Sequence, residues 1–284
     1  MKLTLLAIAA CATCLADGRS TCTTRDVSGT YAFLANGSVL VPGAPISGPF
    51  MRIGSFTANG NGAINFSTLA IYNGINFGAE TFAGTYSVSS DCAVSFNLAV
   101  PQPINANVVF KGQVALGGDD LAFMLISTDD PTKPGISTVA GFGRAREVRS
   151  CSNQSIAGGW RMEINGIRNL PPLGTGSLYR QVGRFQNDGR GGLLASFITS
   201  NNGTISNEAG AGNYKVFPDC TFDLNYTIGT TLYSIRGSMI TGDEAFLGLN
   251  MPGVTQPGVG VISGAVATGT FVRQSDSRDH HDRD

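Results

Sequence analysis

The sequence contains only two histidines, His280 and His281, and both lie in the charge-dense segment at its end. A nucleophilic triad needs a general base, and histidine is the usual one, so the rest of the chain lacks that base. It also has no Ser-x-x-Lys motif, no nucleophile elbow and no P-loop. The sequence therefore predicts no catalytic residue and no cofactor, and it favours a non-enzymatic protein while leaving that question open.

Charge is also scarce. Charged residues make up 14% of the chain and the formal net charge is −1, which argues against nucleic acid or an anionic membrane as a partner. Beyond the first residues, no apolar run is long enough to span a membrane. The oligomeric state is not indicated by the sequence.

Residues 1–16 form a predicted signal peptide. Lys2 precedes an apolar run that is too short for a spanning helix and ends at Ala16 before polar residues. Cleavage there removes Cys11 and Cys14 and predicts a secreted protein. Two alternatives remain, an uncleaved core helix and a bacterial lipoprotein anchored at Cys11, because "IAAC" is similar to a lipobox.

The segment 275–284 is a predicted disordered tail, since it has almost no apolar surface to bury. Within it, Asp279 and Asp282 flank the two histidines, a cluster that fits weak binding of Zn²⁺ or Cu²⁺. A solvated tail without a metal is the favoured interpretation.

An internal repeat covers most of the chain. "GTYSVSSDCAV" at 84–94 matches "GNYKVFPDCTF" at 212–222, and "CTTRDVSGTYAF" from Cys22 matches "CSNQSIAGGWRM" from Cys151. Farther along, Ala122-Phe123 aligns with Ala245-Phe246. The sequence therefore predicts two tandem units, 22–149 and 150–274.

Each unit reads as eight short strands separated by turn signals such as "NGNG" and "GGDD". In the first unit we expect strands at 29–35, 50–58, 63–72, 80–89, 93–100, 107–116, 121–127 and 136–146. No helix-length periodic segment intervenes, so the fold class is all-β. Antiparallel strands must hide their edges, which predicts two tandem eight-stranded antiparallel barrels, with two β-sandwiches as the alternative.

Four cysteines follow the signal peptide: Cys22, Cys92, Cys151 and Cys220. They can pair in three ways, but the spacing within each unit is the same to within one residue. This favours the disulfides Cys22–Cys92 and Cys151–Cys220, each stabilising its unit by roughly 4 kcal/mol in the chain-entropy model. These four cysteines have no Cys-x-x-Cys spacing and no accompanying histidine that would indicate zinc.

The repeated unit resembles a type of small exported microbial protein with no assigned activity, on the pattern Gly-Thr-Tyr-x-Val-x-x-Asp-Cys. More broadly it resembles the calycin superfamily, which includes the lipocalins. There the first strand carries Gly-x-Trp, matched by Gly158-Gly159-Trp160, and an arginine near the end of the last strand covers the tryptophan. The resemblance implies that Arg273 does so here, that Arg144 or Arg146 does so over Tyr31, and that a barrel forms a cup for a small apolar ligand.

The barrel interiors supply the ligand candidates, namely Tyr31 and Phe33 in the first unit and Trp160 and Met162 in the second. The first unit is also rich in phenylalanine, at Phe33, Phe56, Phe66, Phe77, Phe82 and Phe96. The second is rich in arginine, at Arg161, Arg168, Arg180, Arg184, Arg190 and Arg236. Either the phenylalanines fill a barrel and the arginines solvate a face, or the second unit faces an anionic partner.

Five sequons are candidates for N-glycosylation in a eukaryotic host: Asn36, Asn65, Asn153, Asn202 and Asn225. Several fall at predicted turns.

Three functions remain open. The leading hypothesis is a secreted, non-enzymatic tandem barrel that binds a small hydrophobic ligand or a surface partner. The second is a solid-core cell-surface or interaction protein, such as a glycan binder or an effector. The third is a cofactor-free cyclase or isomerase, since barrels related to allene oxide cyclases work mainly by shape. A large apolar cavity would favour the first or third hypothesis over the second.

Overall fold

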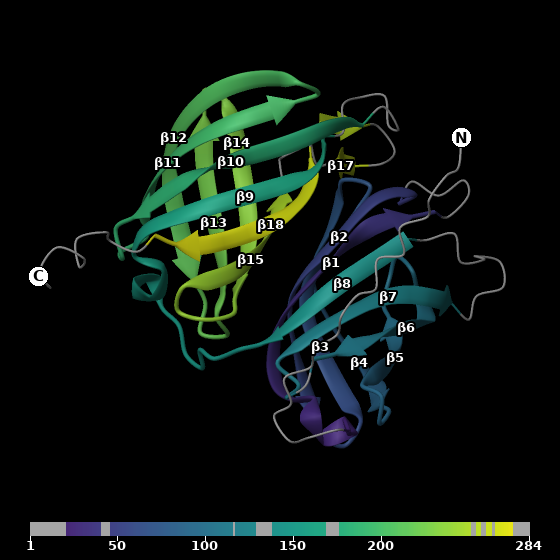
Figure 1. The fold of residues 1–284 in the computed structure, drawn as a ribbon. Coiled ribbons are helices and arrows are strands. Elements are labelled where there is room, and N and C mark those ends of the chain that lie inside the picture. Colours follow the sequence, from purple (N-terminus) through teal and green to yellow (C-terminus); the bar gives the residue numbers. More distant parts are fainter. Residues whose placement is uncertain are drawn as a thin grey trace, which may run out of the picture.

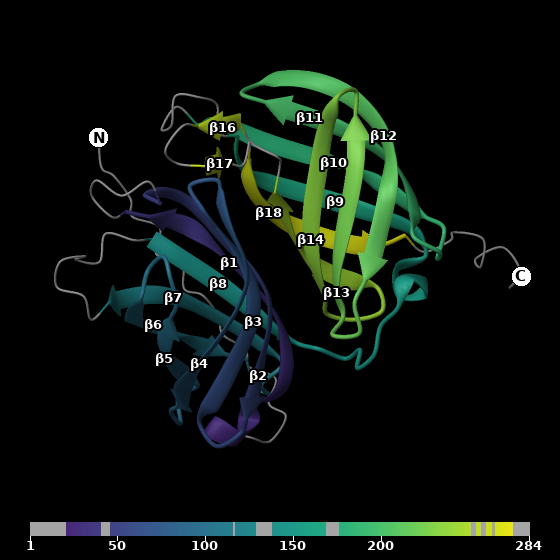
Figure 2. The ribbon, with the colours of Figure 1, turned by 180° about the vertical axis from the view of Figure 1, so that it is seen from behind.

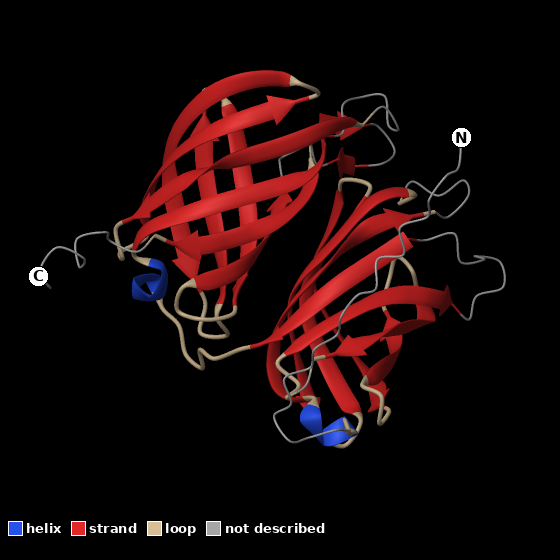
Figure 3. Ribbon diagram, in the orientation of Figure 1, coloured by secondary structure: helices blue, strands red, loops and turns tan. Residues whose placement is uncertain are grey.

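The computed structural model describes residues 21–40, 46–115, 117–128, 138–168, 176–250, 254–256, 260–262 and 265–274. The predicted signal peptide, Cys11 and Cys14 lie outside this part of the chain, as do His280, His281 and the rest of the predicted tail. Two antiparallel β-barrels stand side by side (Figures 1 and 2). Short 3-10 helices precede them, η1 (Thr24–Asp26) and η2 (Asn153–Ile156), drawn in blue in Figure 3.

Barrel one consists of eight strands, each paired with its neighbours in sequence. They are β1 (Ser28–Val39), β2 (Gly48–Asn59), β3 (Ala63–Tyr72), β4 (Ile75–Val88), β5 (Ala93–Val100), β6 (Ala106–Val114), β7 (Asp120–Thr128) and β8 (Thr138–Ala145). Pairing of β8 with β1 and of β4 with β5 closes the barrel. The predicted strands and the predicted closure are confirmed.

Barrel two closes in the same way, with β18 paired to β9. Its strands are β9 (Gly158–Arg168), β10 (Ser177–Asn187), β11 (Gly192–Asn201), β12 (Thr204–Val216), β13 (Thr221–Ile228), β14 (Thr231–Met239), β15 (Glu244–Asn250) and β18 (Val266–Arg273). Between β15 and β18, strands β16 (Val254–Gln256) and β17 (Gly260–Ile262) form a hairpin. Ile262 pairs with Ile75 of β4, so the hairpin extends the sheet of barrel one. The sequence did not predict this crossing.

Both predicted disulfides are present, Cys22–Cys92 and Cys151–Cys220. The tyrosine of the repeated Gly-x-Tyr-x-Val-x-x-Asp-Cys motif makes further contacts near each disulfide. The hydroxyl of Tyr86 receives a hydrogen bond from the Gly60 amide (2.9 Å) and donates one to the Val27 carbonyl. In barrel two the Tyr214 hydroxyl donates to the Asn153 carbonyl (3.1 Å). Each tyrosine therefore holds the segment that precedes the first strand of its barrel, as the disulfide also does.

The predicted alignment of Ala122-Phe123 with Ala245-Phe246 is wrong by one residue. Gly112 pairs with Phe123 in barrel one, whereas the matching Gly237 pairs with Leu247 in barrel two. Because side chains alternate along a strand, a shift of one residue moves them to the opposite face. Phe123 accordingly lies inside barrel one, while Phe246 lies outside barrel two.

The two barrels share a third hydrophobic cluster, distinct from the core of either one. Ala32, Leu34, Met51, Ile53 and Ile71 from β1–β3 pack with Ile240, Phe246 and Val266 from barrel two. Met51 packs directly against Gly248. A β-carbon at position 248 would lie 2.5 Å from the Met51 sulfur, so a larger residue there would clash. This apolar contact holds the outer face of β1–β3 against the outer face of β14, β15 and β18.

Polar contacts surround this cluster. Asn36 Nδ2 donates to Thr268 Oγ1 (2.7 Å), and Arg144 forms an ion pair with Glu244 (2.6 Å). In the connection between the barrels, Arg146 donates to the Met239 carbonyl (3.0 Å). The junction therefore joins an apolar centre to a polar rim, the usual composition of a stable interface.

Candidate functional site

The outer face of β9–β11 is the counterpart of the face that barrel one presents to barrel two, but its chemistry has changed. The repeat aligns Arg161 with Ala32, and Arg184 with Ser55. Ala32 and Ser55 are buried, Ala32 in the cluster shared with barrel two, whereas Arg161 and Arg184 are exposed. A buried contact surface in one barrel is therefore an open, cationic surface in the other.

The strand register brings these two arginines together. Arg184 of β10 is the direct cross-strand partner of Arg161 of β9, so their β-carbons are about 5 Å apart. Like charges in directly opposite positions are destabilising. Among the residues that the structure describes, neither guanidinium has an ion pair or a hydrogen bond.

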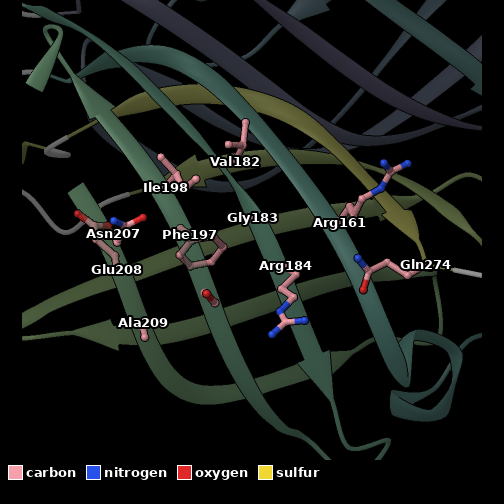
Figure 4. Close-up of a pocket in the computed structure, with 11 residues that line it drawn as sticks. Arg161, Val182, Gly183, Arg184, Phe197, Ile198, Asn207, Glu208, Ala209 and Gln274 are labelled. Atoms are coloured by element: carbon pink, nitrogen blue, oxygen red, sulfur yellow. The ribbon is translucent and has the colours of Figure 1, made fainter. Parts of the chain in front are cut away.

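Beside the arginines the face is hollowed into a groove of about 660 Å³. We call it the arginine groove and define it by Arg161, Val182, Arg184, Ser196, Ile198, Asn207, Glu208 and Gln274. The Glu208 carboxylate accepts hydrogen bonds from Thr199 (2.8 Å) and Ser206 (2.9 Å). Figure 4 shows the two arginines leaving adjacent strands with their guanidinium groups turned apart. Val182 and Ile198, 38% and 51% exposed, supply its apolar part.

A second hollow, of about 480 Å³, continues along the same strands. Leu178, Arg180 and Ser200 line it, and Arg180 is engaged there by Glu163 (3.2 Å). The face thus offers one arginine that has an acidic partner and two that have none among the described residues.

The interior of barrel one is almost filled. Phe33, Phe56, Phe66, Phe96 and Phe123 form a connected set of ring contacts. They leave a cavity of about 30 Å³. A water molecule needs roughly 10–15 Å³ by such a measure, so one or two waters fit and a larger ligand does not.

Arg52 points into this aromatic interior, although it stands on a strand whose outward residues are apolar. It is 5% exposed, donates to Glu80 (2.7 Å) and to the Tyr72 hydroxyl (2.9 Å), and lies 4.8 Å from the Phe82 ring centre. Burial raises the pKa of Glu80, opposed by the charge of Arg52, and burial raises the pKa of Tyr72 to about 12. Neither Arg52 nor Glu80 was among the residues predicted from the sequence to form a site.

Three buried atoms near Arg52 lack a described hydrogen-bond partner: Arg52 Nε, Thr68 Oγ1 and Glu80 Oε1. Buried polar atoms are nearly always satisfied, by protein or by ordered water. Of the three residues, Arg52 lines the small cavity, which has room for water.

Barrel two repeats the glutamate but not the arginine. Gln181 occupies the position of Arg52, and Glu208 that of Glu80. Tyr226 donates to Gln181 (3.3 Å), Gln181 to Thr199 (3.2 Å), and Thr199 to Glu208 (2.8 Å). Because this chain of hydrogen bonds engages the Glu208 carboxylate, the group is held as an acceptor and is poorly placed for acid–base catalysis.

The predicted interior residues are where the sequence placed them. Tyr31 and Phe33 belong to the core of barrel one, and Trp160 and Met162 to the core of barrel two. Phe33 lines the small cavity. Their burial is a matter of packing, and their predicted part in ligand binding stays a prediction.

Arg273 covers Trp160 as the resemblance implied, 4.7 Å from the ring centre. In barrel one, however, Ala145 is the residue that pairs with Tyr31. Arg144 and Arg146 flank it and turn instead to Glu244 and Met239 of barrel two. The expected arginine of barrel one is therefore used in the junction between the barrels.

The five sequon asparagines differ in their exposure and in whether the side-chain nitrogen that would carry a glycan is already hydrogen-bonded. They lie on strands, on η2 or, for Asn202, in a turn. The Nδ2 atom of Asn36 is engaged by Thr268, and that of Asn153 donates to the Arg190 carbonyl (3.3 Å). Asn225 is half-buried on β13, while Asn65 and Asn202 are exposed. Asn65 and Asn202 are the best placed of the five.

Within the described part of the chain, no three His, Cys, Asp or Glu residues are grouped closely enough to hold a metal ion. Neither of the helices described is long and apolar enough to cross a membrane.

No protein-family model and no curated protein matches the chain. Among solved structures, EF1p2_mFAP2b bound to DFHBI matches with a TM-score of 0.33 and 17% identity, over 45% of this chain and 100% of that one. A protein of unknown function from the DUF3598 family, from Nostoc punctiforme, matches with a TM-score of 0.28 and 12% identity, over 88% of this chain and 97% of that one. A protein provisionally named AttH, from Nitrosomonas europaea, matches with a TM-score of 0.30 and 9% identity, over 90% of this chain and 98% of that one. Likenesses this distant carry no argument about function.

Proposed function

We propose that the chain is an exported, non-enzymatic binding protein with solid barrels, and that the arginine groove binds an acidic polysaccharide. One observation carries the proposal. Arg161 and Arg184 are direct cross-strand partners without a described acidic partner, and both line a groove of about 660 Å³. An anion that bridges the two guanidinium groups would remove their repulsion and gain charge-assisted hydrogen bonds.

The filled interior of barrel one supports a binding surface outside the barrels rather than a cup within that barrel. Pockets for small molecules usually measure about 300–1,000 Å³, whereas the interior of barrel one leaves about 30 Å³. A hydrophobic ligand or a cyclase substrate inside barrel one would have to displace packed phenylalanines. The solid-core hypothesis is therefore the better supported of the three.

The groove suits a sugar acid better than a peptide or a nucleic acid. An extended peptide binds by adding to a sheet edge, and the closed barrel beneath the groove has no edge there. Single-stranded nucleic acid needs aromatic side chains for stacking, but the groove's aromatic residue, Phe197, is only 3% exposed. Ser196, Asn207 and Gln274 instead offer hydroxyl and amide groups to sugar hydroxyls.

Export is part of the proposal. The two disulfides favour an oxidising compartment, and the predicted signal peptide provides the route. A secreted protein meets acidic polysaccharides outside the cell, where the arginine groove would be accessible.

Dextran and dextran sulfate test the charge requirement on one polymer backbone, and polygalacturonate tests carboxylates. Calorimetric titration of the mature chain should detect binding to dextran sulfate or polygalacturonate and none to dextran. The variant Arg161→Ser with Arg184→Ser should lose about tenfold or more in affinity. The matched control, Arg25→Ser with Arg149→Ser, removes two exposed arginines elsewhere and should bind as the parent does. Equal binding by both variants, or no binding to either anionic polymer, would refute the proposal.

A further inference from the structure

Barrel one carries an exposed apolar patch on the outer face of β7 and β8. It consists of Ala122, Met124, Ile126, Ala140 and Phe142, and we call it the β7–β8 patch. Its three large members, Met124, Ile126 and Phe142, are 59%, 49% and 52% exposed. The register places Phe142 opposite Ala122, and Met124 opposite Ala140, so the side chains adjoin.

Charges stand at the margin of the patch. Lys111 pairs with Met124 from the neighbouring β6, and Arg144 forms an ion pair with Asp120 (2.9 Å) at one end. An apolar centre with a charged margin is the usual composition of a protein–protein interface. A patch of this kind on an exported protein marks an interaction site.

The patch is continuous with the interface already formed within the chain. Phe142 is the cross-strand partner of Leu34, and Leu34 is buried in the cluster between the barrels. The patch therefore extends the apolar surface of β1–β3 beyond the area that barrel two covers.

The repeat shows that this face is suited to docking against another barrel. Strands β7 and β8 of barrel one correspond to β15 and β18 of barrel two, which present Phe246 and Val266 to barrel one. Barrel two thus uses this face for contact, and barrel one leaves the same face open.

A head-to-tail contact with another copy is disfavoured. It would place the β7–β8 patch on the outer face of β9–β11, where Arg161 and Arg184 stand in place of Ala32 and Ser55. Burying two charges without an acidic partner is strongly unfavourable. The two arginines therefore prevent the docking pattern from repeating as an open filament.

We propose that two copies of the chain form a symmetric dimer through their β7–β8 patches. A two-fold contact brings each patch against itself, so the apolar surfaces cover each other and the arginine groove of each copy stays open to solvent. The dimer rests on the patch and the repeat, and it does not depend on what the arginine groove binds.

Light scattering coupled to size exclusion tests the dimer on the mature chain. The parent should elute with the mass of two chains at micromolar concentration, and Met124→Ser with Phe142→Ser should elute as one chain. Leu178→Ser, which removes a side chain that is 75% exposed on barrel two, should remain dimeric. A parent that stays monomeric at every concentration, or a double variant that still dimerises, would overturn the proposal.

A cross-link gives a positive signal that loss of folding cannot imitate. Met124→Cys should form a disulfide between two chains under mild oxidation, whereas Leu178→Cys should not. Equal cross-linking of the two variants would contradict the patch as the contact. Binding of a monomeric chain to phosphatidylcholine vesicles through the patch would also overturn the dimer, because the occupant would then be lipid.

Discussion

Arg273, at the end of the last strand, lies with its guanidinium carbon 4.7 Å from the ring centre of Trp160 in the first strand of barrel two. The same side chain donates to the carbonyls of Ala157 (2.6 Å) and Ser155 (2.8 Å), just before that first strand. One residue thus ties the beginning of barrel two to its end. Barrel one has Ala145 in the matching place and closes without such a contact.

Replacing Arg273 should destabilise barrel two. Arg273→Ala removes the cation–π contact, the hydrogen bonds to the carbonyls of Ala157, Ser155 and Gly242, and the ion pair with Asp243. The free energy of unfolding should therefore fall by about 2 kcal/mol. Trp160 is the only tryptophan in the chain, so denaturant titration followed by its fluorescence reports on the correct barrel. Arg149→Ala, at an exposed position, should change stability by less than about 0.5 kcal/mol. Equal effects of the two substitutions would refute this role for Arg273.

The disulfide of each barrel should stabilise that barrel separately. Cys151→Ser with Cys220→Ser opens a loop of 69 residues and should lower the free energy of unfolding by about 4 kcal/mol. Peptide mapping without reduction should recover Cys22 linked to Cys92 and Cys151 linked to Cys220. A link between Cys92 and Cys151 would contradict the closure of each barrel on itself.

The junction between the barrels should fail when a charge is placed in it. Ile53 is fully buried between the barrels, so Ile53→Asp should separate them and split one unfolding transition into two. Val182→Asp is the matched control, because Val182 occupies the same place on the open face of barrel two. Differential scanning calorimetry distinguishes the two variants. Two transitions already present in the parent would show that the barrels are not coupled.

The buried tyrosines should stay protonated past pH 10 and should lose their protons only as the protein unfolds at higher pH. Burial raises the pKa of Tyr31 and of Tyr72 from 10.0 to about 12. A raised pKa means that the folded state holds these protons more tightly than the unfolded state does. Their contribution to stability is therefore complete below pH 10 and is lost as the pH rises toward 12. Absorbance at 295 nm should stay flat past pH 10 and then rise together with unfolding, whereas a gradual rise centred on pH 10 would contradict the burial.

Strand positions and barrel closure followed from turn signals and alternation, which are local properties of the chain. Arg52 did not, because β2 is covered on both faces. Its outward residues Met51 and Ile53 lie under barrel two, while its inward face holds an ion pair with Glu80. An alternation rule that assigns apolar residues to the inside fails on such a strand. The repeat aligns Arg52 with Gln181 and Glu80 with Glu208. These polar residues at matching strand positions are the sequence feature that could have located the pair.

The arginine groove was only partly predictable. Its arginines were visible as an excess in the second unit, but their grouping depends on strand register, which pairs Arg161 with Arg184. Arg236, in the same predicted set, forms an ion pair with Asp223 (2.7 Å) on other strands. The crossing hairpin β16–β17 was not predictable, since a single residue pair, Ile262 with Ile75, joins it to barrel one.

Hydrogen–deuterium exchange of the mature chain, with and without dextran sulfate, tests the central claim most directly. Binding in the arginine groove should slow exchange in peptides of β9–β11 that contain Arg161 and Arg184. Peptides of barrel one should be unchanged, and dextran should protect nothing. Protection confined to barrel one, or spread evenly over both barrels, would contradict the assignment of the binding surface to the arginine groove.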